Sequence, residues 1–141
     1  MTLLVNQTIT TAITGQASGA VQVREGNPHS ALIQANFTYG SGGTNATVWV
    51  QTSVDGGTTW IDVVSFQFTT SSLRQVVNLS AYTPVTTLYT ALDGALTANT
   101  AKDGLLGPLF RTKITTTGTY AGGTTLSVNL VACGAKATSL T

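Results

Sequence analysis

Apolar and polar residues alternate with a period of two along most of this chain. The clearest runs cover residues 33–39 and 126–130, where an apolar side chain stands at every second position. Residues 47–52 and 61–68 are rich in β-branched and aromatic side chains, which suit a pleated surface. Both patterns are typical of β-strands with at least one buried face. Weaker runs at 8–14, 20–24, 73–79 and 110–116 bring the expected number of strands to about eight.

Glycine-rich turns such as 40–43 and 121–123 separate these runs. Many short strands with frequent turns predict an all-β fold, namely an antiparallel β-sandwich with jelly-roll or Greek-key wiring. The 141 residues are enough for one hydrophobic core, so we expect a single domain over 1–141. Residues 1–7 and 134–141 are expected to be flexible or partner-bound termini.

Residues 53–60 carry the strongest turn signal in the chain. Asp55 and the paired Gly56 and Gly57 supply the backbone conformations of a short hairpin loop between two strand-like runs. We expect Asp55 to accept backbone N–H groups across the turn, and Trp60 to pack on the base of the hairpin. The structural hairpin therefore comprises Ser53, Asp55, Gly56, Gly57, Thr59 and Trp60.

The same residues match the Asp-box of sialidase-type β-propellers, Ser-x-Asp-x-Gly-x-Thr-Trp. In the sialidases the box recurs once in each blade, and the catalytic residues lie elsewhere. This chain has one copy and is too short for a propeller. The match therefore implies a hairpin and no sialidase chemistry.

Alternation lapses over residues 81–108, which we expect to form one long connection with a helical turn near 88–92. Connections of this length without regular structure are uncommon in compact domains, and they tend to be functional or to pack on something. The apolar residues of the segment should contact either one end of the sandwich or a neighbouring subunit, and we favour the neighbour. These candidate partner-contact residues are Leu88, Leu92, Leu96, Leu105 and Leu106.

Charge is scarce: 8% of residues are charged and the net charge is +1. The six basic residues are scattered between Arg24 and Lys136, which disfavours nucleic-acid binding. No apolar run approaches the roughly 18 residues of a membrane span. Few basic residues guard the expected strand edges, so coverage by further copies in a homo-oligomer is the simplest expectation. An ordinary polar sandwich with short or bulged edges is the alternative.

Cys133 is the only cysteine and cannot form an internal disulfide. The segment after Met1 lacks the basic start and apolar core of a signal peptide, so we expect synthesis in a reducing cytoplasm.

The sequence offers no catalytic, cofactor-binding or metal site, and we do not expect an enzyme. His29, the only histidine, has no ligand partners at suitable spacing, so it is expected on a surface loop. Cys133 is expected to be a small buried thiol. The acidic residues are Glu25, Asp55, Asp62, Asp93 and Asp103, and three of them precede glycine, which indicates turns rather than a paired-carboxylate site.

Aromatic side chains could alternatively form a face that binds a glycan. The candidates are Trp49, Trp60, Tyr82, Tyr89 and Tyr120. For Trp49 and Trp60 we favour core positions over a binding platform.

Several motifs resemble those of small β-sandwich virion proteins of tailed bacteriophages. They are the Asp-Gly-Gly-x-x-Trp hairpin at 55–60, the run Gly107-Pro108-Leu109-Phe110-Arg111, and the hairpin Thr117-Gly118-Thr119-Tyr120; the likeness covers roughly residues 30–132. The resemblance implies a virion structural protein without catalytic residues, made in the host cytoplasm. It further implies a capsid decoration or cement subunit that docks on the major capsid protein. A carbohydrate-binding module of a phage fibre or tail, and a head–tail connector or tail component, are the alternatives.

Overall fold

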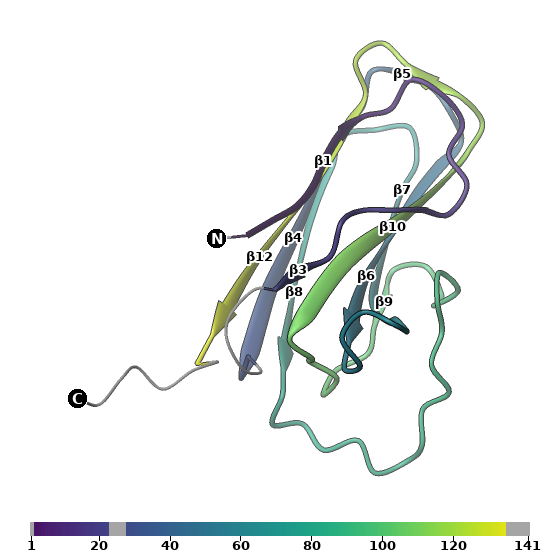
Figure 1. Ribbon diagram of the computed structural model, residues 1–141. Helices are drawn as coiled ribbons and strands as arrows, with labels where there is room; N and C mark the ends of the chain where they lie inside the picture. The colour runs from purple at the N-terminus through teal and green to yellow at the C-terminus, as the bar shows by residue number, and fades with distance from the viewer. Residues whose placement is uncertain (1, 23–27, 135–141) are drawn as a thin grey trace.

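The computed structural model describes residues 2–22 and 28–134, and this part of the chain forms two antiparallel sheets packed face to face (Figure 1). No helix occurs among the described residues. The first sheet has four strands in the order β1 (Thr2–Thr8), β12 (Thr125–Cys133), β4 (Ser30–Thr38) and β8 (Leu73–Ser80).

The second sheet has six strands, and the antiparallel sandwich predicted from the sequence is confirmed. Its order is β2 (Gln16–Ala17), β10 (Leu109–Thr117), β6 (Asn45–Ser53), β7 (Ile61–Phe68) and β9 (Thr100–Ala101), and β3 (Val21–Gln22) also pairs with β10. A separate two-stranded ribbon joins β5 (Ser41–Gly42) to β11 (Tyr120–Ala121). Seven of the described strands have seven to nine residues, and the other five have two residues each.

The core lies between the two sheets, and it is built from every second residue of the long strands. Val48 and Val50 of β6 are fully buried in it, while Trp49 between them points to the other side of the sheet. Towards one end the core is aromatic: the rings of Phe37 and Phe68 stack with centroids 5.0 Å apart, and Tyr120 meets Phe37 edge-on at 5.5 Å.

Strand β12 lies between β1 and β4, so the two ends of the described chain meet in one sheet. Its register pairs Leu126 with Phe37 of β4 on one side and with Gln7 of β1 on the other. Hairpin β6–β7 is the one pair of long strands that are neighbours in both sequence and sheet within the described chain.

The N-terminal expectations need correction. Residues 2–7 are not a free terminus but belong to β1, which pairs with β12 along its length. The expected strand at 8–14 is wrong, because after Thr8 the chain crosses to the other sheet. Ile9 and Ile13 are buried during this crossing, so their apolar spacing reflects packing rather than a strand.

Two smaller expectations also change. The weak run at 20–24 forms only the two-residue strand β3, and residues 23 and 24 lie outside the described part. Residues 88–92 contain no helical turn. Of the expected C-terminal tail 134–141, only Gly134 is described.

Candidate functional site: the long connection and its anchor

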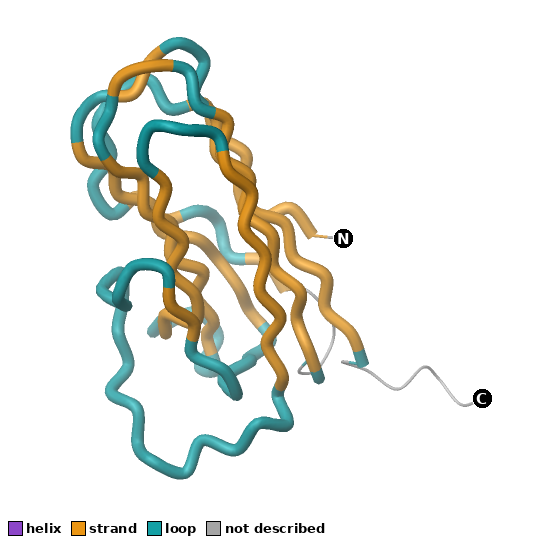
Figure 2. Tube along the Cα trace, turned by 180° about the vertical axis from the view of Figure 1, so that it is seen from behind, coloured by secondary structure: helices purple, strands orange, loops and turns teal. Residues whose placement is uncertain are grey.

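The expected single connection over 81–108 is interrupted by β9, which pairs with β7. Its first part, residues 81–99 between β8 and β9, makes a wide excursion beyond one end of the sandwich (Figures 1 and 2). Its outgoing half exposes apolar side chains: Leu88 is 100% exposed, Tyr82 is 71% exposed, and Val85 is also exposed. The excursion therefore presents an apolar tip to its surroundings. We call residues 82–88 the tip.

A buried carboxylate fastens the returning half of this segment to the sheet. Asp62 of β7 is 0% exposed, and its oxygens accept hydrogen bonds from the backbone N–H groups of Gly94, Ala95 and Leu96 at 2.8 to 3.0 Å. The N–H of Asp62 donates in turn to the carbonyl of Leu92 at 2.8 Å. Residues 92–96 thus wrap around one side chain, in the manner of a backbone anion nest.

Side chains on neighbouring strands extend this contact into a network. The Gln51 amide nitrogen donates to Asp62 at 2.8 Å and to Asp93 at 2.7 Å, and the Gln51 oxygen accepts from Arg111 Nε at 2.7 Å. Asp93 also forms ion pairs with Arg111 at 3.5 Å and with Lys113 at 3.1 Å. We call these five residues, Gln51, Asp62, Asp93, Arg111 and Lys113, the anchor.

The electrostatics of Asp93 follow from this setting. Partial burial raises the pKa of its carboxyl group. Hydrogen bonds from Gln51 and Lys113, together with the charges of Lys113 and Arg111, outweigh burial and leave the pKa below its usual value. Asp93 is therefore ionised at neutral pH and holds two cations beside the connection.

Both tryptophans flank the anchor. The Arg111 guanidinium lies 4.5 Å above the ring of Trp60, and Trp49 donates its ring N–H to the carbonyl of Leu96 at 3.0 Å. Trp60 is buried and Trp49 half-buried, but neither belongs to the core between the sheets. The expected core position is therefore wrong for Trp49, whose ring lies on the outer face of the six-stranded sheet against Leu96, whereas Trp60 is buried as expected, beneath Arg111.

The anchor holds the connection against the six-stranded sheet. Each of its charged groups is engaged by partners within the protein, and Asp62 has no exposed surface. Such a saturated network fixes the geometry of the backbone around it. It holds the base of the protruding tip in one position.

Residues 53–60 form the expected hairpin turn. The Asp55 carboxylate accepts the N–H of Thr59 at 2.9 Å and also the Thr59 hydroxyl, while Ser53 Oγ accepts the N–H of Gly57 at 2.9 Å. Gly56 and Gly57 have φ values of 75° and 92°, as the turn requires. The hydrogen bonds from the side chain and backbone of Thr59 lower the pKa of Asp55 to about 2.

The five candidate leucines separate into three environments. Leu88 lies in the exposed tip, and Leu92 and Leu96 are half-buried where the segment is anchored. Leu106 belongs to the core, so the prediction that it contacts a partner is wrong; Leu105 is half-buried and packs against the core. Contact with the core explains why Leu105 and Leu106 are apolar, and no neighbouring subunit is needed to explain it.

His29 is exposed, as expected, and its ring lies 5.2 Å from that of Tyr82. Cys133 is exposed rather than buried, because it falls on the outer side of β12 at the end of the strand. Among residues 2–22 and 28–134, no three His, Cys, Asp or Glu side chains come together as metal ligands. The same part of the chain contains no helix long and apolar enough to cross a membrane.

Sequence reasoning missed the anchor. It treated Asp62 as one of five scattered acids and gave Gln51 and Arg111 no role. One signal was available: Asp62 interrupts an otherwise apolar strand between Ile61 and Val63, where a charge needs buried partners.

Comparison with known proteins adds no relative: no family model, no curated protein and no solved structure matches the chain.

Proposed function

We propose that this chain is a structural protein of a tailed-phage virion, and within the virion a capsid decoration or cement subunit that acts by self-association and docking on the shell. The observation that carries the proposal is the tip: an exposed apolar segment held out from the sandwich by a saturated polar anchor. Exposed apolar patches on otherwise polar domains mark sites of protein contact. A fixed base lowers the entropic cost of such a contact.

The four-stranded sheet supports the same proposal. Arg74 is the only charged residue in β1, β4, β8 and β12. The outer face of this four-stranded sheet otherwise carries hydroxyl, amide and aliphatic side chains, such as Asn36, Asn129 and Leu32. A surface with so few charges can be covered by a neighbouring protein without the large desolvation cost of unpaired ions.

The carbohydrate-binding alternative has less support. Its expected platform used Trp60 and Trp49, but Trp60 is buried under Arg111 and the Trp49 ring N–H is bonded to Leu96. Tyr82 is the aromatic that remains widely exposed among those considered. Connector and tail roles would use the same tip at another place in the particle.

Cosedimentation of the purified chain with virions and empty capsids of the phage that encodes it tests the proposal. We expect saturable binding to particles, weakened at least about tenfold by Leu88→Asp, which places a charge in the contact. Thr70→Asp is the matched control, because Thr70 is exposed in the turn between β7 and β8. A chain that remains in the supernatant with every type of particle contradicts the proposal.

A further inference from the structure

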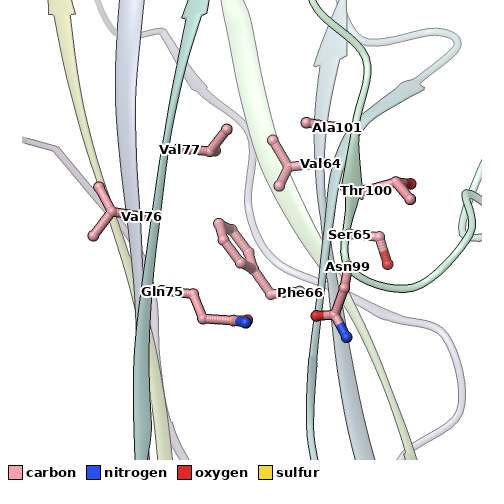
Figure 3. Close-up of a pocket in the computed structure, with 9 residues that line it drawn as sticks. All are labelled: Val64, Ser65, Phe66, Gln75, Val76, Val77, Asn99, Thr100 and Ala101. Carbon is pink, nitrogen blue, oxygen red and sulfur yellow. The ribbon is translucent and has the colours of Figure 1, made fainter.

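A groove runs along the open side of the sandwich, where β8 ends one sheet and β9 ends the other (Figure 3). Its volume is about 190 Å³, and Val64, Phe66 and Val77 line its apolar part. Two polar atoms at the groove, Ser65 Oγ and Gln75 Oε1, are shielded from solvent and have no hydrogen-bond partner within the described chain. Buried polar atoms without partners are costly, so this side of the domain is incomplete on its own.

The hydrogen bonds at the end of β8 show which of its backbone groups face outward. The N–H of Ser80 donates to Asp103 at 2.7 Å, away from β4, while the next N–H, of Ala81, donates to His29 beside β4. Backbone groups of successive strand residues point to opposite sides. The N–H and C=O groups of Arg74, Val76 and Asn78 therefore point outward, and no strand of the described chain pairs with them.

Strand β8 carries one feature that protects edge strands from association, the charge of Arg74, and lacks the others. It contains neither lysine nor proline, and its register against β4 shows no bulge. Val76 is 54% exposed at its centre. The edge is an open template for another strand.

We propose that a second copy of this chain pairs with β8 antiparallel, about a two-fold axis at Val76, joining two four-stranded sheets into one. An axis at Gln75 or Val77 would pair only two of the three outward residues and give about four hydrogen bonds, whereas an axis at one of the outward residues places a hydrogen-bonded pair at Arg74, Val76 or Asn78. An axis at Arg74 would set two arginines directly opposite each other, which is destabilising. An axis at Asn78 would need the Ser80 N–H, which Asp103 already occupies. Val76 remains.

In this register Val76 faces the partner's Val76, and Arg74 faces the partner's Asn78. These pairs exchange about six backbone hydrogen bonds across the new edge. Gln75 lies diagonal to the partner's Gln75, within reach of a long side chain, so each shielded amide oxygen gains an amide donor from the other copy. Because the axis is two-fold, each copy obtains the same backbone hydrogen bonds and the same partner for its Gln75 oxygen, as in most homodimers.

The inference deepens the self-association within the proposed function and rests on it to that extent. Disulfide trapping in a Cys133→Ser background tests the register. Paired Cα atoms of a hydrogen-bonded antiparallel pair lie about 5.5 Å apart, which suits a disulfide, so Val76→Cys is expected to crosslink to itself under mild oxidation. Non-reducing electrophoresis and intact mass report the product.

Two further variants are the matched controls. Arg74→Cys alone and Asn78→Cys alone place like cysteines about 13 Å apart, too far for a disulfide. A mixture of the two is expected to crosslink, because Arg74 faces the partner's Asn78. Crosslinking of Val76→Cys no faster than Arg74→Cys alone overturns the register.

Proline substitution tests the pairing without cysteine. Val76→Pro removes an outward N–H and leaves the β4 ladder intact, so the fold should survive while the dimer dissociation constant rises at least about tenfold. Val77→Pro removes an N–H bonded to β4 and is expected to destabilise the domain itself. Circular dichroism monitors the fold, and light scattering across a dilution series measures the mass.

The results separate this inference from the proposed function. An oligomer whose mass Val76→Pro leaves unchanged, or a monomer at every concentration, overturns the β8 interface even if the chain binds particles. A dimer that crosslinks through Val76→Cys but never sediments with particles supports the interface and contradicts the virion proposal.

Discussion

Asp62→Asn is the most informative single substitution, because it changes one atom in the anchor and almost nothing in size. An asparagine keeps one acceptor oxygen where the aspartate has two. If this oxygen accepts from Gly94, Ala95 and Leu96, the new NH₂ group faces the Gln51 amide nitrogen, which in the unsubstituted protein donates to Asp62 at 2.8 Å. If the amide turns over, its NH₂ group faces the three backbone donors instead.

Either arrangement leaves at least one donor without an acceptor and weakens the rest. Rotation of Gln51 does not repair this, because it would break the bonds to Asp93 and Arg111. A hydrogen bond to a charged group contributes about 1.5 to 3 kcal/mol. Loss of one such bond and weakening of the others gives an expected destabilisation of about 3 kcal/mol, or roughly 10 °C in Tm for a domain of this size.

Urea unfolding followed by tryptophan fluorescence measures the effect, since Trp49 and Trp60 both lie beside the anchor. Hydrogen exchange should accelerate most at the amides of 94–96, which lose their acceptor. Asp55→Asn makes the same chemical change on an exposed carboxylate and should leave exchange at 94–96 unchanged. A free energy of unfolding within about 0.5 kcal/mol of the parent, with unchanged exchange at these amides, would refute the anchor as the fastening of the connection.

Two other predictions address the hairpin turns. The pKa of Asp55 falls from 3.8 to about 2 in the folded chain through its bonds with Thr59, so its stabilising contribution is present above about pH 4 and is lost as the pH falls towards 2. An NMR titration of this carboxyl group with a midpoint near 3.8 contradicts the hairpin geometry. Gly43→Ala should cost about 2 to 4 kcal/mol in urea unfolding, because φ is 70° and a Cβ would lie 2.4 Å from the buried Tyr120 ring. Gly19→Ala, in open space, should change the free energy of unfolding by less than about 0.5 kcal/mol, and equal effects of the two substitutions would exclude the clash.

The long strands were predictable because their signal is local. Alternation over 33–39 and 126–130 reflects which side chains enter the core; β4 covers residues 33–38 of the first run, and β12 covers the whole of the second. The crossing at Ile9 and Ile13 misled the same reasoning, since two buried residues four positions apart fit a strand on paper. Only the path between the sheets explains them.

The anchor was not predictable in this way, because its members are far apart in sequence. Gln51 and Arg111 are 60 residues apart and meet only because β6 pairs with β10 in one particular register. For Leu106 the sequence did show an apolar residue that should be buried. It could not show whether the core or a neighbouring subunit buries it. Strand pairing supplies the missing information in both cases.

The position of β12 between β1 and β4 has a consequence for how this chain folds during synthesis. The four-stranded sheet cannot close until residue 133 has left the ribosome, since β12 is the last of the described strands to be made. Until then β1 and β4 each lack a neighbour, and β4 has no charged residue that would oppose pairing with another chain. Folds in which strands far apart in sequence must pair assemble slowly, and their unpaired strand edges can aggregate before folding is complete. Premature termination before β12 would therefore yield an aggregating fragment rather than a smaller stable domain.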